Sequence, residues 1–380
     1  MKNRIGIVGG GQLGKMMTQE AKKMGFYVII LDPTPNSPAG QVADKQVVAD
    51  YNDEKAIIFV AKNSDYLTFE IENTNGEFLD ELERKVSCKI NPSGKSWRLF
   101  QDKLAQKQLF RKYKLPTPKF MPVDNIQDLE KAIKKFKLPI LLKARFDAFD
   151  GRGNALIKKK KDIEKAWEKL NPPTRGRKLY VEEFILFDKE LAVMVARSDK
   201  GEIVPYPVAE TIQKNNICHY VLAPAQISDI AKKRAINLAI KTMKLLKGAG
   251  VFGIEMFKTK DDHVLINEIA PRVHNSGHYT IEACITSQFE QHIRAITGLP
   301  LGKTDMITPV AVMVNILGDR LGEAKVEGFH KALAIPNVAV HIYNKKDTKP
   351  ERKMGHITVI DKDIKSAYKK AKLARKYINI

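Results

Sequence analysis

Cysteine is scarce in this sequence of 380 residues, with only Cys88, Cys218 and Cys284 present. The three stand far apart, so no pair has the spacing of a zinc or redox motif, and no disulfide framework is expected. Apolar runs are also short, and none approaches the roughly 20 residues that a membrane-spanning helix requires. The opening stretch MKNRIGIV contains no apolar targeting segment. These absences predict a cytoplasmic protein with reduced thiols and no membrane partner.

Acidic residues are in deficit relative to basic ones. The 44 Asp and Glu stand against 65 Lys and Arg, which gives a formal net charge of +21. Such an excess fits either a nucleic-acid partner or a small anionic substrate. The lysines are spread over stretches such as 131–137 and 158–161, and no basic motif is interleaved with base-stacking aromatic residues. Solvated helix faces are therefore the favoured interpretation, with no nucleic-acid partner. A basic nucleic-acid-binding protein on an inactive nucleotide fold is the alternative.

The first 95 residues alternate between strand and helix patterns. Strands are predicted at 5–8, 27–31, 46–49 and 66–71, and helices at 12–24 and 54–62. This alternation is typical of an open parallel sheet, whose ligands bind at the carboxyl ends of its strands. Gly9, Gly11 and Gly14 have the G-x-G-x-x-G spacing at the first such end. A helix that begins after glycines offers backbone amides to an anion, so an anionic ligand is expected there.

Carboxylates follow the other strands of this domain. Asp32 stands where a dinucleotide fold places its ribose-binding acid, so the glycine loop alone favours a nicotinamide dehydrogenase. Glu70 and Glu72 lie at the end of the last predicted strand, and the two-residue period of a strand puts them on one face. They fit either a substrate contact or a solvated loop edge.

The pattern changes after the first domain. The stretch 91–118 carries a helix that ends before Pro116 and Pro118, and it marks a domain boundary. From Pro139 onward, short strands joined by tight turns predict an antiparallel or mixed sheet, with a helix at 229–247. The chain is therefore expected to combine α/β and α+β parts.

The hairpin GVFGIEMFKTKDDHVLINEIAPR allows a register to be worked out. If its turn is centred between Asp261 and Asp262, Thr259 faces Val264 and Glu255 falls opposite Glu268. Two carboxylates so placed in apolar strands repel each other unless a cation lies between them. Magnesium, which binds carboxylates and phosphates together, is the expected occupant. Two glutamates on a solvated edge are the alternative.

Further motifs in this region fit a nucleotide. The loop DAFDGRGN places glycines beside Arg152, which suits either a flap over a phosphate chain or a plain hairpin turn. Lys143 ends an apolar run just before it, where a phosphate-binding ammonium is plausible. The stretch YVEEFILFDKE offers an acid, a strand edge and Glu190, which suit the adenine amino group, the adenine ring edge and the ribose hydroxyls.

The order of these motifs resembles the ATP-grasp superfamily, and within it the N5-carboxyaminoimidazole ribonucleotide synthetase family. The resembling stretches are GIVGGGQLGKMM, FEIEN, QDKLAQKQLF, FDGRGN, EEFI, GIEMF, NEIAPRVHNSGHYT and RKMGH, which together run from Ile5 to His356. The resemblance implies an ATP-grasp fold with an N-terminal Rossmann-like parallel-sheet domain (1–95), central ATP-grasp lobes (96–300, flexible lobe about 115–180) and a small C-terminal domain (301–380). A sister ATP-grasp ligase that uses formate or an amino acid is the alternative.

The resemblance also implies a reaction and its partners. ATP-dependent carboxylation of aminoimidazole ribonucleotide with bicarbonate, through carboxyphosphate, would give ADP, phosphate and the N5-carboxylated product for purine biosynthesis. The 5-amino nitrogen would capture either the carboxyl group of carboxyphosphate or the CO2 that it releases. ATP is the co-substrate and Mg²⁺ the cofactor, with Mn²⁺ as a substitute and with neither biotin nor NAD. A homodimer is implied, as is a separate carboxyaminoimidazole ribonucleotide mutase that takes the product.

The family's functional residues carry over onto the matching positions of this sequence. The implied ATP-binding residues are Lys103, Lys143, Phe149, Asp150, Gly151, Arg152, Gly153, Glu182, Glu183, Phe184, Ile185, Glu190, Gln213, Asn267 and Glu268. The implied substrate-binding residues are Gly11, Gln12, Leu13, Glu70, Arg272, Lys345, Arg352 and Lys353, with the glycine loop on the 5′-phosphate. The implied catalytic residues are Asp150, Arg272, His274, Asn275 and Lys345. Glu255 and Glu268 are the implied metal ligands.

Two positions depart from the family pattern. Phe149 stands where the family usually has a tyrosine, so any role for a phenolic hydroxyl is lost or moved. Gln213 replaces a histidine of the nucleotide site; it still donates a hydrogen bond but carries no proton charge. Neither departure removes a metal ligand or a phosphate-binding cation, so activity is expected, with an altered rate or pH profile.

Overall fold

The computed structural model describes residues 3–146, 153–171 and 178–380. Its first part is the parallel sheet predicted from the sequence, in the order β3-β2-β1-β4-β5. The strands are β1 (Arg4–Val8), β2 (Tyr27–Leu31), β3 (Lys45–Val47), β4 (Tyr66–Phe69) and β5 (Lys89–Ile90). The helices are α1 (Gln12–Lys23), α2 (Glu54–Lys62), α3 (Gly76–Lys85) and α4 (Gly94–Gln101).

The structure has two helices in the stretch where the sequence predicts a single helix. Asp102 ends α4 and begins α5 (Lys103–Lys112). Its carboxylate accepts hydrogen bonds from the amides of Leu104 and Ala105, which makes it an N-cap, and it binds Arg145 as well. The single helix predicted for this stretch is therefore wrong, and the change of direction at Asp102 carries α5 into the centre of the molecule.

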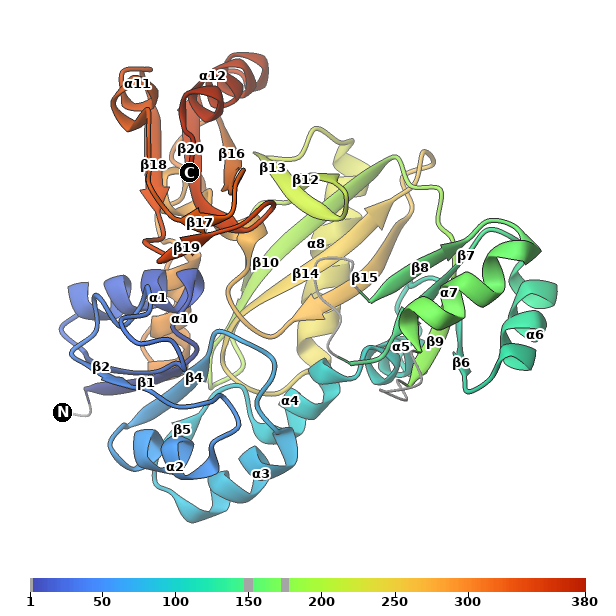
Figure 1. Cartoon of the computed structure of the whole chain (residues 1–380), viewed down its shortest axis with the longest axis horizontal. Coiled ribbons are helices and arrows are strands. Elements are labelled where there is room, and N and C mark those ends of the chain that lie inside the picture. Colours follow the sequence, from blue (N-terminus) through green and yellow to red (C-terminus); the bar gives the residue numbers. More distant parts are fainter. Residues whose placement is uncertain (1–2, 147–152, 172–177) are drawn as a thin grey trace.

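A small antiparallel sheet forms one lobe, in the order β6-β9-β7-β8. Its strands are β6 (Phe120–Val123), β7 (Ile140–Ala144), β8 (Asn154–Ile157) and β9 (Leu179–Glu183). The elements packed on it are α6 (Ile126–Phe136), η1 (Lys160–Asp162) and α7 (Ile163–Leu170). This lobe lies at the end of the molecule opposite the C-terminal strands (Figure 1).

The largest sheet has nine strands and continues into the C-terminal part of the chain. Its path is β15-β14-β10-β12-β13-β16-β20-β18, and β11 pairs with β10. The strands are β10 (Lys189–Arg197), β11 (Ile203–Pro205), β12 (Ala209–Lys214), β13 (Ile217–Ala223), β14 (Gly250–Lys258), β15 (Val264–Ala270), β16 (Val310–Leu317), β18 (Val338–Ile342) and β20 (Lys353–Asp361). The pairing of β13 with β16 joins the two parts into one surface.

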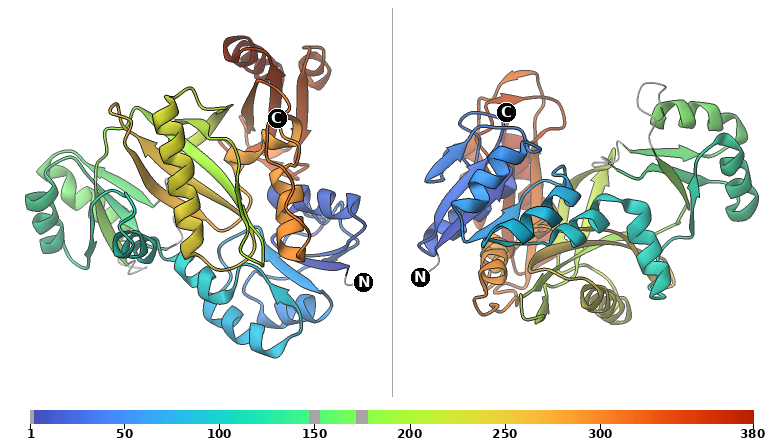
Figure 2. Two further views of the ribbon diagram at one scale, coloured as in Figure 1. Left: turned by 180° about the vertical axis from the view of Figure 1, so that it is seen from behind. Right: turned by 90° about the horizontal axis from the view of Figure 1, so that it is seen from below.

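Helices cover this sheet along its length. On its back face lies α8 (Asp229–Leu245), as Figure 2 shows. The other elements are η2 (Asn275–Gly277), α9 (Thr280–Ala283), α10 (Gln288–Thr297), α11 (Phe329–Leu333), α12 (Ile364–Tyr377) and the short pair β17 (Gly322–Glu323) with β19 (Asp347–Thr348). No helix within the described residues is both long and apolar enough to span a membrane.

A polar interface joins the C-terminal strands to η2 and α9. Asn315, His356 and His341 form a row across β16, β20 and β18. The Asn315 amide exchanges two hydrogen bonds with Asn275, of 2.7 and 2.9 Å. His341 Nε2 lies 2.6 Å from an oxygen of Glu282. This interface sets where the C-terminal strands sit relative to the loop after β15.

Three groups at this interface resemble a metal-ligand set. Glu282, His341 and His356 each place one ligand atom within 4.8 Å of the others. However, the rings of His341 and His356 are stacked 4.3 Å apart with only 9° between their planes. The lone pairs of imidazole nitrogens lie in the ring plane, so two stacked rings do not direct them at one ion. The cluster is therefore a structural contact, in which the hydrogen bond between His341 and Glu282 connects β18 to α9.

Candidate active site

One cleft of about 1750 Å³ gathers residues from all parts of the fold. It is lined by the glycine loop, both sheets of the central region and the segment that joins β18 to β20. The predicted site residues that line it are Gly11, Gln12, Leu13, Glu70, Lys103, Lys143, Glu182, Glu183, Phe184, Ile185, Glu190, Gln213, Glu255, Asn267, Glu268, Arg272, His274, Asn275, Lys345, Arg352 and Lys353. Residues up to 342 positions apart in sequence thus face one space.

Part of the predicted flap lies outside the described residues, namely Phe149, Asp150, Gly151 and Arg152. Gly153 is described and its carbonyl accepts a hydrogen bond of 2.8 Å from the amide of Ala144. The roles of these five residues stay predictions.

The hairpin β14–β15 brings Glu255 opposite Glu268, as predicted. The register near its turn differs, because Lys258 faces Val264 where Thr259 was expected to. The turn is longer than predicted: the Thr259 amide binds the His263 carbonyl at 2.9 Å, and three residues form the loop. A bulge at Asn267 then restores the alignment. The predicted glutamate pair is therefore confirmed, whereas the predicted two-residue turn and the register next to it are wrong.

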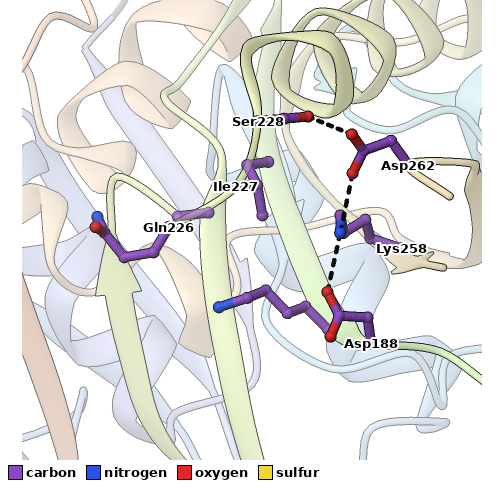
Figure 3. A pocket seen from close by; sticks show the side chains of 8 residues that line it. Asp188, Gln226, Ile227, Ser228, Lys258 and Asp262 are labelled. Carbon is purple, nitrogen blue, oxygen red and sulfur yellow. Dashed lines mark hydrogen bonds and ion pairs between the residues drawn. The ribbon is translucent and has the colours of Figure 1, made fainter. Parts of the chain in front are cut away.

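Side chains at the outer end of the hairpin hold this longer turn. Asp262 has a φ of 60°, the left-handed conformation that such loops require. Its carboxylate accepts a 2.6 Å hydrogen bond from Ser228, the N-cap of α8, and binds Lys258 at 2.9 Å. Lys258 also binds Asp188, at 2.9 Å, as Figure 3 shows. The turn is thereby tied to α8 and to the start of β10.

Charge in the glutamate pair is distributed unevenly. The Lys103 ammonium binds Glu268 at 2.5 Å. Burial raises the pKa of Glu268, but the ammoniums of Lys103 and Lys143 outweigh it and lower the pKa to about 2. Burial and the charge of Glu268 raise the pKa of Glu255 to about 8. One carboxylate of the pair is therefore held ionised while its neighbour is poised to take up either a proton or a cation.

The oxygens around this pair suit a hard divalent cation. Asn267, which forms the bulge, directs its amide nitrogen at Glu255 over 3.5 Å. Its Oδ1 atom is buried and has no hydrogen-bond partner among the described residues. Two carboxylates and an unpaired amide oxygen are the type of ligand set that Mg²⁺ prefers. The residues present thus fit the metal that the sequence implied.

Aromatic and acidic side chains line the part of the cleft between the two lobes. Phe187 and Phe257 stack with ring centroids 4.9 Å apart. Glu190, on β10, has its pKa raised to about 7 by burial. Phe184, which is exposed, and Gln213 line the same cleft. An apolar slot flanked by a carboxylate and an amide suits a flat heterocycle with a polyol attached.

His274 lies beside the glutamate pair, and Arg272 lines the same cleft. The Nε2 atom of His274 lies 3.5 Å from Glu255 Oε1, and its Nδ1 atom lies 3.1 Å from the Ser276 hydroxyl. Arg272 binds Glu72 at 3.0 Å. Glu72, which the sequence left between a substrate contact and a solvated edge, is thus an ion-pair partner of the loop after β15.

The glycine loop already binds an anion, and that anion belongs to the protein. Glu70 accepts hydrogen bonds from the amides of Gly11 and Leu13, the latter at 2.9 Å. A Cβ at Gly11 would lie 2.5 Å from a Glu70 oxygen, and one at Gly14 would lie 2.4 Å from the Gly9 carbonyl. The glycines are required by these close approaches. Burial raises the pKa of Glu70, against the effect of the amides.

Asp32 is occupied by its own surroundings. Its carboxylate accepts hydrogen bonds from the amides of Gly10 and Thr34, at 2.7 and 2.8 Å, and from the Tyr51 hydroxyl at 2.9 Å. The ribose contact on which the dehydrogenase reading depends would have to displace these bonds. The fingerprint in this chain therefore stabilises the loop itself.

The C-terminal segment brings cations to the glycine loop. Lys345 donates a 2.8 Å hydrogen bond to the carbonyl of Lys353 and lies 5.8 Å from the centre of the Tyr343 ring. Arg352 donates to the Asp347 carbonyl at 2.6 Å. From the other side, Lys15 of α1 donates to the carbonyls of Ile342 and Tyr343, at 3.1 and 3.4 Å. Sequence reasoning missed Lys15, whose place within the glycine-loop helix was its only signal.

Three domain families match the sequence in the same order as the parts of the fold. The ribonucleotide synthetase preATP-grasp domain matches residues 1–101, the ATP-grasp domain residues 108–289, and the phosphoribosylaminoimidazole carboxylase C-terminal domain residues 311–370. The ATP-grasp fold with a parallel-sheet domain before it, predicted from the motifs, is confirmed.

Individual relatives agree with these matches. The chain is 44% identical over 373 residues to the phosphoribosylaminoimidazole carboxylase of Candida albicans, which covers 96% of this chain but 65% of that protein. It is 48% identical to the N5-carboxyaminoimidazole ribonucleotide synthetase of Thermotoga maritima, with a TM-score of 0.90 and coverage of 100% of this chain and 99% of that one. The Aspergillus clavatus N5-carboxyaminoimidazole synthase, solved with ADP and 5-aminoimidazole ribonucleotide, is 36% identical over 99% of this chain and 98% of its own, with a TM-score of 0.90.

Proposed function

Because the chain belongs to the N5-carboxyaminoimidazole ribonucleotide synthetase family of ATP-grasp enzymes, we propose that it carboxylates the amino group of 5-aminoimidazole ribonucleotide at the expense of ATP. Bicarbonate supplies the carboxyl group, and ADP and phosphate are the other products. The chain spans 65% of the length of its Candida albicans relative, so the proposal concerns the activity of this part alone.

The observation that carries the proposal is the position of Glu255. It lies opposite Glu268 in the hairpin and also 3.5 Å from His274, in the loop that leads toward the C-terminal strands. The carboxylate proposed to hold magnesium is thus adjacent to the imidazole proposed for the carboxyl-transfer point. The cleft that contains both continues from the aromatic slot to the cations Lys345, Arg352 and Lys353. One cleft can therefore hold both substrates with their reacting ends together.

The nucleotide is proposed to occupy the slot between the lobes. The stacked rings of Phe187 and Phe257 pack against one side of the adenine, and Glu190 accepts from the ribose hydroxyls. Lys103 and Lys143 act as point charges on the phosphate chain. Glu255 and Glu268 would hold a magnesium ion, which would supply positive charge against the negative charge that develops during transfer.

The ribonucleotide is proposed to occupy the opposite end of the cleft. Lys345, Arg352 and Lys353 surround its 5′-phosphate, and Gln12 adds a contact from the start of α1. Glu70 accepts hydrogen bonds from the amides of Gly11 and Leu13. Glu70 therefore affects substrate binding by fixing the conformation of the glycine loop. This arrangement aims the 5-amino nitrogen at the centre of the cleft.

Activation and transfer are proposed to occur between these ends. A bicarbonate oxygen attacks the γ-phosphorus, the bond to the ADP oxygen breaks, and carboxyphosphate forms. The 5-amino nitrogen then bonds to the carboxyl carbon, phosphate leaves, and the nitrogen loses a proton. Arg272, His274 and Asn275 hold the carboxyl group and limit access of water, because carboxyphosphate hydrolyses readily. Asp150 remains the predicted proton acceptor.

Activity of the purified chain tests the proposal. ADP release should require Mg²⁺ and be stimulated by 5-aminoimidazole ribonucleotide plus bicarbonate. Stimulation by formate plus glycinamide ribonucleotide would assign the chain to a sister ligase. Addition of NADH should change nothing, and binding of DNA or RNA without nucleotide turnover would support the basic nucleic-acid-binding alternative. The homodimer, the separate mutase and the cytoplasmic location stay predictions.

A further inference from the structure

Helix α5 presents two lysines, one turn apart, to carboxylates of different sheets. Lys103 binds Glu268 on β15 at 2.5 Å. Lys107 binds Glu182 on β9 at 2.9 Å. Residues four apart on a helix share a face, so both ammoniums point the same way. The family resemblance assigned a role to Lys103 and none to Lys107.

Lys107 cannot reach a ligand in the cleft. Its residue is only 1% exposed, and Glu182 is 2% exposed. The ammonium also donates hydrogen bonds to the Thr117 hydroxyl at 2.9 Å and to the Ile266 carbonyl at 3.3 Å, whereas its contact with Glu182 Oε1 is an ion pair without hydrogen-bond geometry. Any effect of Lys107 on a bound nucleotide must therefore pass through a neighbouring residue.

That neighbour is Lys143, because the two lysines share one carboxylate. Lys107 binds Oε1 of Glu182 at 2.9 Å, and Lys143 lies 3.3 Å from Oε2. Lys143 is on β7, lines the cleft and lies 5.9 Å from the centre of the Tyr180 ring. One carboxylate between two ammoniums leaves one positive charge in excess. Since Lys107 is buried and Lys143 faces the cleft, the excess is available at Lys143.

We propose that Lys107 is a positioning residue for nucleotide phosphates, because it neutralises Glu182 and so leaves the charge of Lys143 for the phosphate oxygens. The proposal rests on the nucleotide site of the proposed function. Without Lys107, Glu182 and Lys143 form a closed and buried ion pair, and a phosphate group has to compete with a carboxylate for the same ammonium. The loss should therefore concern the phosphates and spare the nucleoside.

The test compares ADP with adenosine, measured by calorimetric titration of the full chain at pH 7 with Mg²⁺ and without ribonucleotide. Lys107→Met keeps the length of the side chain and removes its charge. We expect the Kd for ADP to rise about tenfold or more, the size of effect typical of one charged contact. The Kd for adenosine should stay within about twofold. The control Lys112→Met, an exposed position of the same helix, should change neither value.

Two further variants separate charge from folding. Lys107→Gln removes the charge but keeps a hydrogen-bond donor for the Thr117 hydroxyl, so the Kd for ADP should rise as in Lys107→Met even if that variant fails to fold. Lys107→Arg keeps a positive charge opposite Glu182, so its Kd for ADP should stay within about threefold of the starting value. An equal loss for ADP and adenosine in the uncharged variants, or weak ADP binding by a folded Lys107→Arg, overturns the proposal.

These measurements do not depend on the carboxylation reaction. The unaltered chain could bind ADP and yet form no ADP from ATP when the ribonucleotide and bicarbonate are present. That result would refute the proposed carboxylase activity and leave the test of Lys107 intact. If the uncharged variants of Lys107 bind ADP and adenosine as the unaltered chain does, and that chain carboxylates the ribonucleotide, the inference alone is refuted.

Discussion

Glu255 and Glu268 lie directly opposite each other across β14 and β15, and the Lys103 ammonium contacts only the second of them within 4 Å among the described residues. The pair is thereby divided into one carboxylate with a fixed cation and one that contacts only the His274 imidazole among the basic side chains of the described residues. Such asymmetry provides an opening for a metal ion at Glu255 while Glu268 is held in place.

Replacing Glu268 tests this division. Glu268→Gln keeps the shape but removes one of the two charges for magnesium, and turnover should fall by about three orders of magnitude. The free energy of unfolding should change little, because relief of the repulsion with Glu255 offsets the lost pair with Lys103. Steady-state ADP release and urea denaturation measure the two effects. Glu323→Gln, at an exposed site, is the control; near-normal rates in both Glu255→Gln and Glu268→Gln would make the hairpin purely structural.

Substitutions at the two ends of the ribonucleotide site should have different kinetic effects. His274→Ala acts at the reacting carboxyl group, so product formation should fall even at saturating ribonucleotide, and some ATP should be hydrolysed without product. Gln12→Ala removes a contact remote from the chemistry and should mainly raise the KM for the ribonucleotide, by about tenfold. ADP and product are quantified together across a ribonucleotide titration. A raised KM alone in His274→Ala, with ADP and product still equal, would remove His274 from the transfer site.

The contact between α1 and β18 should affect substrate binding selectively. Lys15→Met deletes a buried ammonium that donates to the carbonyls of Ile342 and Tyr343. We expect the protein to lose about 1–3 kcal/mol of stability and the KM for the ribonucleotide to rise several-fold, with the KM for ATP unchanged. Lys22→Met, also on α1, breaks an exposed pair with Asp44 in the loop before β3 and should cost less than about 1 kcal/mol. Equal changes in both KM values would contradict a role confined to the acceptor end.

Stability should decline in mild acid. Burial lowers the pKa of His292 from 6.5 to about 4, so the unfolded chain binds a proton there that the folded chain excludes. Stability is therefore complete above about pH 6.5 and falls as the pH decreases toward 4, by about 2 kcal/mol between pH 7 and pH 5 from this residue alone. Urea denaturation at several pH values measures the slope. It should be shallower in His292→Gln and unchanged in His263→Gln, an exposed control; equal slopes in all three would exclude His292 as the source.

Local patterns in the sequence predicted the parts of the fold that local physics decides. The strand at Tyr27–Leu31 and the helix at Glu54–Lys62 have the predicted bounds, because apolar periodicity and an Asp53 cap define them. The opposition of Glu255 and Glu268 was also predicted, although two deviations had to cancel. The longer turn around Asp262 shifts the register by one residue, and the bulge at Asn267 shifts it back.

Features that depend on distant parts of the chain could not be predicted in this way. No local pattern reveals that β13 pairs with β16 and extends one sheet across two parts of the molecule. The same holds for Glu70, which occupies the amides that a glycine loop normally offers to a ligand. Lys107 did leave a signal, since it stands four residues after Lys103 in a predicted helix, but its partner Glu182 lies 75 positions away.

The contact of Lys15 with Ile342 spans 327 positions of the chain, which has a consequence for synthesis and folding. Closing a loop of that length costs about 5 kcal/mol in chain entropy, so the first domain cannot acquire this contact early. The residues proposed for the nucleotide lie between Lys103 and Glu268, whereas Lys345 to Lys353 leave the ribosome much later. A growing chain is therefore expected to assemble its nucleotide lobes first and its ribonucleotide end last.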